Sequence, residues 1–98
     1  MNLDTVKARW ADHMSEPFPD GLRWIDAPSG ESVPALDSYI AGCVTTYLSG
    51  QGPLDPQRRQ ILCDCAAELA AVLPSLPESD APYVTRLIQI ADLVTAQN

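Results

Sequence analysis

Residues 55–74 read DPQRRQILCDCAAELAAVLP, and this stretch decides the fold class. Asp55 followed by Pro56 is a strong helix start, because the aspartate accepts a hydrogen bond from the first turn and proline tolerates the first helical position. Apolar residues then recur at helical spacing until Pro74, which a helix does not readily continue through. The stretch predicts a helix over residues 56–73.

Apolar residues recur at spacings of three and four in three more stretches, two of which are bounded by prolines. We predict these helices at residues 3–14, 33–49 and 80–96. The second carries no charge after Asp37, which is typical of a central helix packed on two sides. Because the last two connections are short, we expect antiparallel neighbours and an all-α four-helix bundle, formed as one domain by residues 1–98.

Residues 15–31 (SEPFPDGLRWIDAPSGE) interrupt the helical pattern between the first two helices. Three prolines forbid a continuous helix here, and Asp20-Gly21 is a turn signal. We therefore predict a long irregular loop. Its apolar residues argue against disorder because they need a place to be buried.

The chain has 98 residues and a net charge of −7, from 13 acidic and 6 basic residues. This charge disfavours binding to nucleic acids and to anionic lipid headgroups, and it favours a basic protein partner. No segment has the roughly 20 apolar residues of a membrane span, and the first residues do not resemble a signal peptide. Three cysteines, an odd count, favour a reducing compartment, so we expect a cytoplasmic protein.

Motifs of catalysis and of cofactor binding are missing from the sequence. There is one histidine, His13, so a metal site with paired imidazoles is not available. No nucleophile elbow, phosphate loop, dinucleotide fingerprint or HExxH motif occurs. We expect neither an enzyme nor a cofactor or metal site, and we expect His13 to be partly exposed near the end of the first helix.

The three cysteines raise the alternative of a thiol sensor or a metal carrier. Cys63 and Cys65 differ by about 200° around a helix, so they cannot bind one ion together. We place Cys65 in the core, near enough to Cys43 for a disulfide to be conceivable. Cys63 lies on a face of alanines, which we expect to be covered by Trp10 of the first helix or by a partner helix.

The loop and one helix face supply the predicted binding surface. Aromatic side chains ringed by charges are typical of interface hot spots, although the aromatics could equally close one end of the bundle. Asp64 and Glu68, four residues apart, share a helix face that is suited to water or to a basic partner. The predicted partner-binding residues are Phe18, Asp20, Arg23, Trp24, Asp26, Glu31, Asp64 and Glu68.

In size, charge and helix content the whole chain resembles the small, acidic, all-helical immunity proteins of bacterial toxin systems. This resemblance implies a non-catalytic inhibitor that binds a basic toxin or nuclease and blocks its active site. A phage-encoded inhibitor of a host nuclease fits the same description. The alternatives are the thiol sensor or metal carrier, and a homodimeric structural or adaptor protein that pairs through the alanine face.

Overall fold

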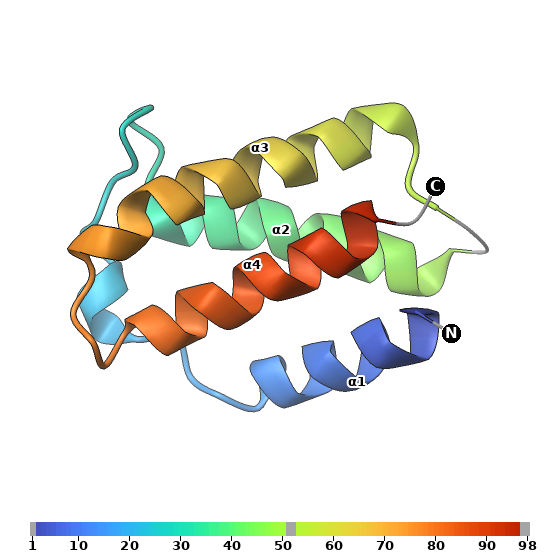
Figure 1. Cartoon of the computed structure of the whole chain (residues 1–98), viewed down its shortest axis with the longest axis horizontal. Coiled ribbons are helices and arrows are strands. Elements are labelled where there is room, and N and C mark those ends of the chain that lie inside the picture. Colours follow the sequence, from blue (N-terminus) through green and yellow to red (C-terminus); the bar gives the residue numbers. More distant parts are fainter. Residues whose placement is uncertain (1, 51–52, 97–98) are drawn as a thin grey trace.

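The computed structural model describes residues 2–50 and 53–96, and it contains four α-helices and no strand in these ranges (Figure 1). The all-α prediction is therefore confirmed. The helices are α1 (Asn2–Met14), α2 (Val33–Ser49), α3 (Pro56–Val72) and α4 (Ala81–Thr95), with short 3-10 turns at η1 (Asp20–Leu22) and η2 (Leu73–Ser75). None of the described helices is long and apolar enough to cross a membrane.

Side-chain caps fix the starts of α2 and α3. Ser32 Oγ accepts a hydrogen bond from the backbone N–H of Ala35 at 3.2 Å, and Asp55 accepts one from the backbone N–H of Arg58 at 3.2 Å. Asp55 also binds the guanidinium of Arg58 at 2.7 Å. Helix α3 ends at Val72, one residue before the predicted end, because the chain tightens into η2 ahead of Pro74.

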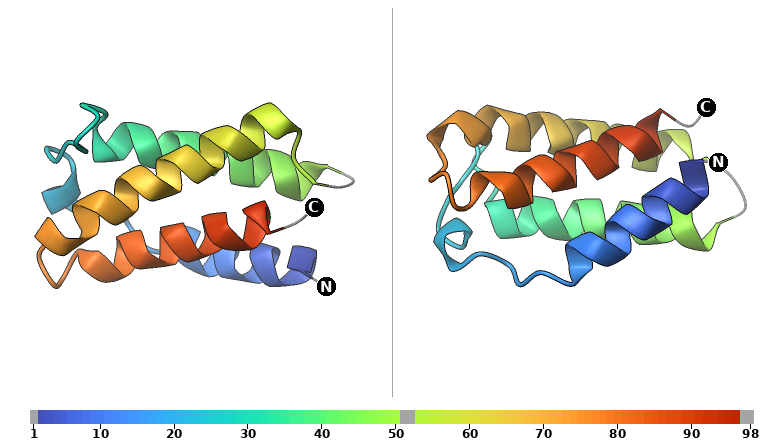
Figure 2. Two further views of the ribbon diagram at one scale, coloured as in Figure 1. Left: turned by 45° about the horizontal axis from the view of Figure 1, so that its top comes forward. Right: turned by 60° about the horizontal axis from the view of Figure 1, so that its bottom comes forward.

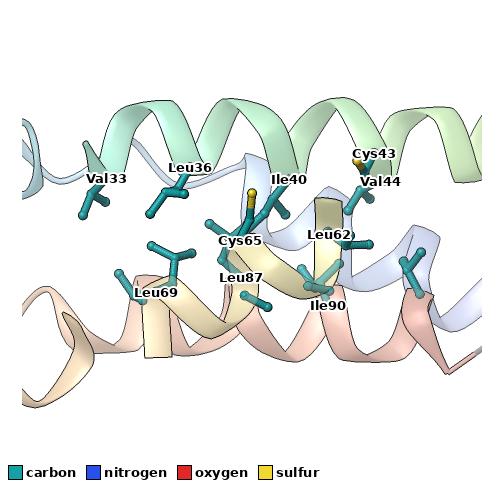
Figure 3. Packing of buried hydrophobic residues seen from close by; sticks show 14 of the residues in the cluster. Val33, Leu36, Ile40, Cys43, Val44, Leu62, Cys65, Leu69, Leu87 and Ile90 are labelled. Carbon is teal, nitrogen blue, oxygen red and sulfur yellow. The ribbon is translucent and has the colours of Figure 1, made fainter. Parts of the chain in front are cut away.

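Helices α2, α3 and α4 pack against one another around the core (Figure 3). Leu36 and Ile40 of α2 lie against side chains of the other two helices, such as Leu69 of α3 and Leu87 of α4, and all four are fully buried. The prediction that the helix without a charge after Asp37 is central holds for α2, which contacts each of the other helices, but α4 does so too.

Helix α1 packs chiefly on α4 and more lightly on α2, on the side of the molecule away from α3 (Figure 2). Its buried residues are Val6, Trp10 and His13, whereas Leu3 and Met14 are exposed. The helical spacing of Leu3, Val6, Trp10 and Met14 predicts that all four face inward, and this is wrong for Leu3 and Met14. The expectation that His13 lies partly in solvent is also wrong, because His13 is buried in place of Met14. The two positions are about 100° apart on the helix, and α4 meets the side that carries His13.

Residues 15–32 do not form one long irregular loop, which corrects the sequence prediction. Turn η1 is followed by an isolated antiparallel bridge between Asp26 and Ser32, with backbone hydrogen bonds from Ala27 to Glu31 at 2.8 Å and from Val33 to Ile25 at 2.9 Å. Gly30, at φ +96°, supplies the left-handed residue in the turn between the bridged residues. Only short pieces of the connection are left without such backbone pairing.

Candidate functional site

Trp24 is the most exposed of the large apolar side chains, with 89% of its surface accessible. It lies two residues after the end of η1, and residues close to it in the chain on both sides are anchored. Leu22 is fully buried and Ala27 is 4% exposed, while the backbone of Ile25 is paired with that of Val33. The indole is therefore held outward by a fixed backbone.

Phe18 behaves differently from Trp24. It is half-buried, and its ring meets that of Tyr83 edge-on at 5.6 Å, with 86° between the planes. This is a favourable aromatic geometry that adds to the burial of both rings. Phe18 closes the edge of the core, whereas Trp24 points outward.

The charged residues of the predicted surface fall into two groups. Asp20 and Arg23 form an exposed ion pair at 3.0 Å, and Arg23 directly precedes Trp24 in the chain. The other group lies beside the turn that precedes α2. In this turn the Ser29 hydroxyl donates a hydrogen bond to Glu68 of α3. The turn is thus fastened to α3.

Three carboxylates contribute negative charge near Cys65, and we call this group the acidic patch: Glu31, Asp64 and Glu68. The charges of all three raise the pKa of Cys65, although the residues come from two separate elements. Asp64 also accepts a hydrogen bond from Gln60 at 2.9 Å. Asp26 is exposed at the base of the same turn, in the backbone bridge to Ser32.

All three thiols are free. Burial first, and then the charges around it, raise the pKa of Cys65 to about 11. Burial also raises the pKa of Cys43, whose Sγ donates a weak hydrogen bond to the Arg58 carbonyl at 3.7 Å. A raised pKa leaves little thiolate near neutral pH, so neither buried cysteine suits redox or metal chemistry.

Cys63 is half-buried and lies in a shallow groove of about 280 Å³ between α3 and α4. The groove is lined by Cys63, Ala66, Ala67, Ala70, Ile88, Asp92 and Thr95. The expectation that Trp10 covers the alanines is wrong, because the indole stacks on His13 at 5.7 Å between centroids. Helix α4 borders the alanine face instead.

The structure also contains a polar cluster around the buried His13 that the sequence did not reveal. His13 is 2% exposed, and its ring lies 4.3 Å from that of Tyr83. The Tyr83 hydroxyl donates a hydrogen bond to Asp37 Oδ2 at 2.9 Å, and Arg86 forms an ion pair with Glu16 at 2.8 Å. Residues of α1, α2 and α4 therefore meet at one point.

Burial decides the protonation states in this polar cluster. It lowers the pKa of His13, outweighing the nearby charge of Asp37, so the imidazole is neutral at neutral pH. It raises the pKa of Asp37 despite the hydrogen bond from Tyr83, and it raises the pKa of the Tyr83 phenol. The stripe through Val6 and Trp10 allows His13 to lie inside, at a spacing of three from Trp10, but it allows Met14, at a spacing of four, equally well.

Within residues 2–50 and 53–96, no three His, Cys, Asp or Glu side chains are grouped as a metal ion would need. The chain matches no protein-family model, no curated protein and no solved structure. A function for this protein therefore has to be inferred from the physical character of its own surface.

Proposed function

We propose that this protein is a non-catalytic inhibitor of immunity type. It would bind a basic protein partner in the cytoplasm, a toxin or a nuclease, and cover the partner's active site with an acidic surface. The observation that carries this proposal is the 89% exposure of Trp24 on a backbone that is itself anchored.

An exposed indole on a fixed turn is what a binding hot spot requires. Tryptophan buries a large apolar area when it enters a pocket, and it is enriched among the residues that dominate binding energies. Because Leu22 and Ala27 already hold the turn, little backbone freedom is left to lose on binding. The anchoring would thus favour affinity.

The charge of the chain supports a basic partner. A net charge of −7 attracts a basic protein over long range and accelerates association, in a way that salt weakens. Glu31 and Glu68 lie near the turn that Ser29 fastens to α3, so carboxylates are available beside the turn to meet lysines or arginines of a partner. The same charge repels phosphate backbones.

The two alternatives have less support. A thiol sensor needs an accessible thiolate, and Cys43 and Cys65 are buried with raised pKa values. A homodimer through the alanine face would use the groove that contains Cys63, which is shallow and carries the charged Asp92. Neither the buried thiols nor this groove indicates a binding function as specifically as the exposed Trp24 does.

The test is affinity capture with the wild-type chain, followed by measurement of whether the purified chain inhibits the captured protein. Trp24→Ala should weaken binding by at least about thirtyfold, the effect of a hot-spot residue worth about 2 kcal/mol. Asp26→Lys should slow association and reduce its dependence on salt. Tyr39→Ala is the matched control, because Tyr39 is an exposed aromatic residue on α2 and lies outside the proposed surface.

The folded chain should tolerate these changes, since substitutions of exposed residues usually alter stability by less than about 0.5 kcal/mol. Loss of binding would therefore report on the interface. If Trp24→Ala and Asp26→Lys bind the captured protein as tightly as Tyr39→Ala does, the proposed surface is wrong. If the captured protein is bound but not inhibited, the inhibitor function is wrong.

A further inference from the structure

His13 is the single histidine of the chain, and it is buried without a hydrogen bond to either ring nitrogen from the described residues. Buried polar atoms are normally paired, so an unpaired imidazole in a core needs an explanation. It lies between two aromatic rings, Trp10 on its own helix and Tyr83 on α4. The ring is packed there as if it were an apolar group.

The charged groups that face His13 come from all the elements packed around it. Asp37 lies on α2, Arg86 on α4, and Glu16 just beyond the end of α1. Asp37 already accepts the hydroxyl of Tyr83, and Glu16 is paired with Arg86. His13 therefore has charged neighbours but no hydrogen bond to any of them within residues 2–50 and 53–96.

We propose that His13 is an acid-sensitive latch, whose protonation releases the end of α1 from α4 and α2. An imidazolium carries two N–H donors, and in the docked state neither has an acceptor. It would also be a charge in a site that excludes water, which is strongly unfavourable. Release of the helix end lets water solvate the charge.

Helix α1 rather than the whole molecule is the part released, because it contributes little to the core. Among its described side chains only Val6, Trp10 and His13 are buried, whereas the rest of the core comes mainly from α2, α3 and α4. His13 is one of the three buried side chains that hold α1 on its neighbours, so loss of favourable burial there weakens the docking of α1. The ion pair of Glu16 with Arg86, both partly exposed, is the other tie at this end.

The direction of the pH effect follows from the two protonation states. A released His13 has an ordinary pKa of about 6.5, and burial lowers the pKa of the docked one. The released form consequently binds more protons as the pH falls below about 6.5, so docking weakens up to about tenfold per pH unit until the docked pKa is reached. Well above pH 7 His13 is neutral in both the docked and the released form, so α1 keeps its full docking stability.

Asp37 opposes this effect and has to be separated from it. Burial raises its pKa in the folded protein, so its protonation at falling pH favours the folded state. Its negative charge also stabilises a protonated His13. Replacement of Asp37 by asparagine should therefore keep the acid sensitivity of α1, or increase it, whereas replacement of His13 should remove it.

Hydrogen exchange of the full chain at pH 7.5 and pH 5.5, corrected for intrinsic exchange rates, tests the latch. We expect the protection of the α1 amides to fall about tenfold at pH 5.5 while that of α3 stays constant. His13→Phe, which keeps an aromatic ring, should abolish the change, and Asp37→Asn should not. Unchanged α1 protection in the wild type, or an acid response that persists in His13→Phe, would overturn the proposal.

A second measurement needs no variant. The single imidazole can be titrated by NMR in the wild-type chain. We expect its protonation to follow the loss of α1 protection and to occur below pH 6.5. An imidazole that protonates with an ordinary pKa near 6.5 while α1 remains protected would equally overturn the latch.

Discussion

Tyr83→Phe removes a single hydroxyl from the polar cluster around His13 and leaves the ring in place. The hydroxyl donates to Asp37 Oδ2 at 2.9 Å, and it links α4 to α2. A hydrogen bond to a charged acceptor contributes about 1.5–3 kcal/mol. Because Asp37 is only partly buried, water can replace some of this, and we expect a loss of about 1.5 kcal/mol at pH 7.5.

For a chain of this length, that loss corresponds to a decrease of about 8 °C in Tm. Urea denaturation followed by circular dichroism measures the free energy of unfolding directly. Tyr39→Phe is the control, since Tyr39 is 49% exposed and the same hydroxyl removed there should cost less than about 0.5 kcal/mol.

The loss should also depend on pH, in a direction that the pKa of Asp37 determines. Burial raises this pKa, and the hydrogen bond from Tyr83 partly counteracts the rise, so it should be higher still in Tyr83→Phe. A carboxylate is a stronger acceptor than a carboxyl group. The difference between variant and wild type is therefore largest well above the folded pKa of Asp37 and shrinks as the pH falls through it. A Tyr83→Phe protein within about 0.5 kcal/mol of wild type at pH 7.5, or equally destabilised at pH 7.5 and at pH 3.8, the ordinary pKa of an aspartate, would refute this reasoning.

Two further predictions concern the thiols and the glycines. In the native chain at pH 8, a thiol reagent should modify the half-buried Cys63 first, and Cys65, with a pKa of about 11, much more slowly, as peptide mapping after partial labelling would show. Gly30→Ala should destabilise the chain by about 1 kcal/mol because Gly30 has φ +96°, whereas Gly42→Ala, in α2 with nothing within 4 Å of the added Cβ, should stabilise it by up to about 1 kcal/mol. Urea titrations of the two glycine variants check both signs, and a Gly30→Ala protein as stable as Gly42→Ala would contradict the second prediction.

The helices could be predicted because their signals are local. The caps at Ser32 and Asp55 and the break at Pro74 act on their own neighbours in the chain, and the structure places the helix ends within a residue or so of the expected positions. The same locality explains why Cys63 and Cys65 could be assigned to different sides of α3.

What could not be predicted depends on which helices meet. Val6 and Trp10 define a stripe that continues equally well through His13 or Met14, and only the position of α4 decides between them. The contact of Ser29 with Glu68 likewise joins segments 39 residues apart, whose proximity no local pattern states. The polar cluster arises from three helices, so its existence was visible only in three dimensions.

The packing of α1 on α4 has a consequence for synthesis of the chain. Helix α1 leaves the ribosome before α2, α3 and α4, yet its main neighbour is the last of these. Helices α2 and α3, which adjoin in sequence, can pair while α4 is still being made. Throughout this time Val6 and Trp10 have no complete surface to pack on. Until α4 is available, the nascent chain therefore presents an amphipathic helix without its main neighbour, a state in which a chaperone or a partner would find α1 accessible.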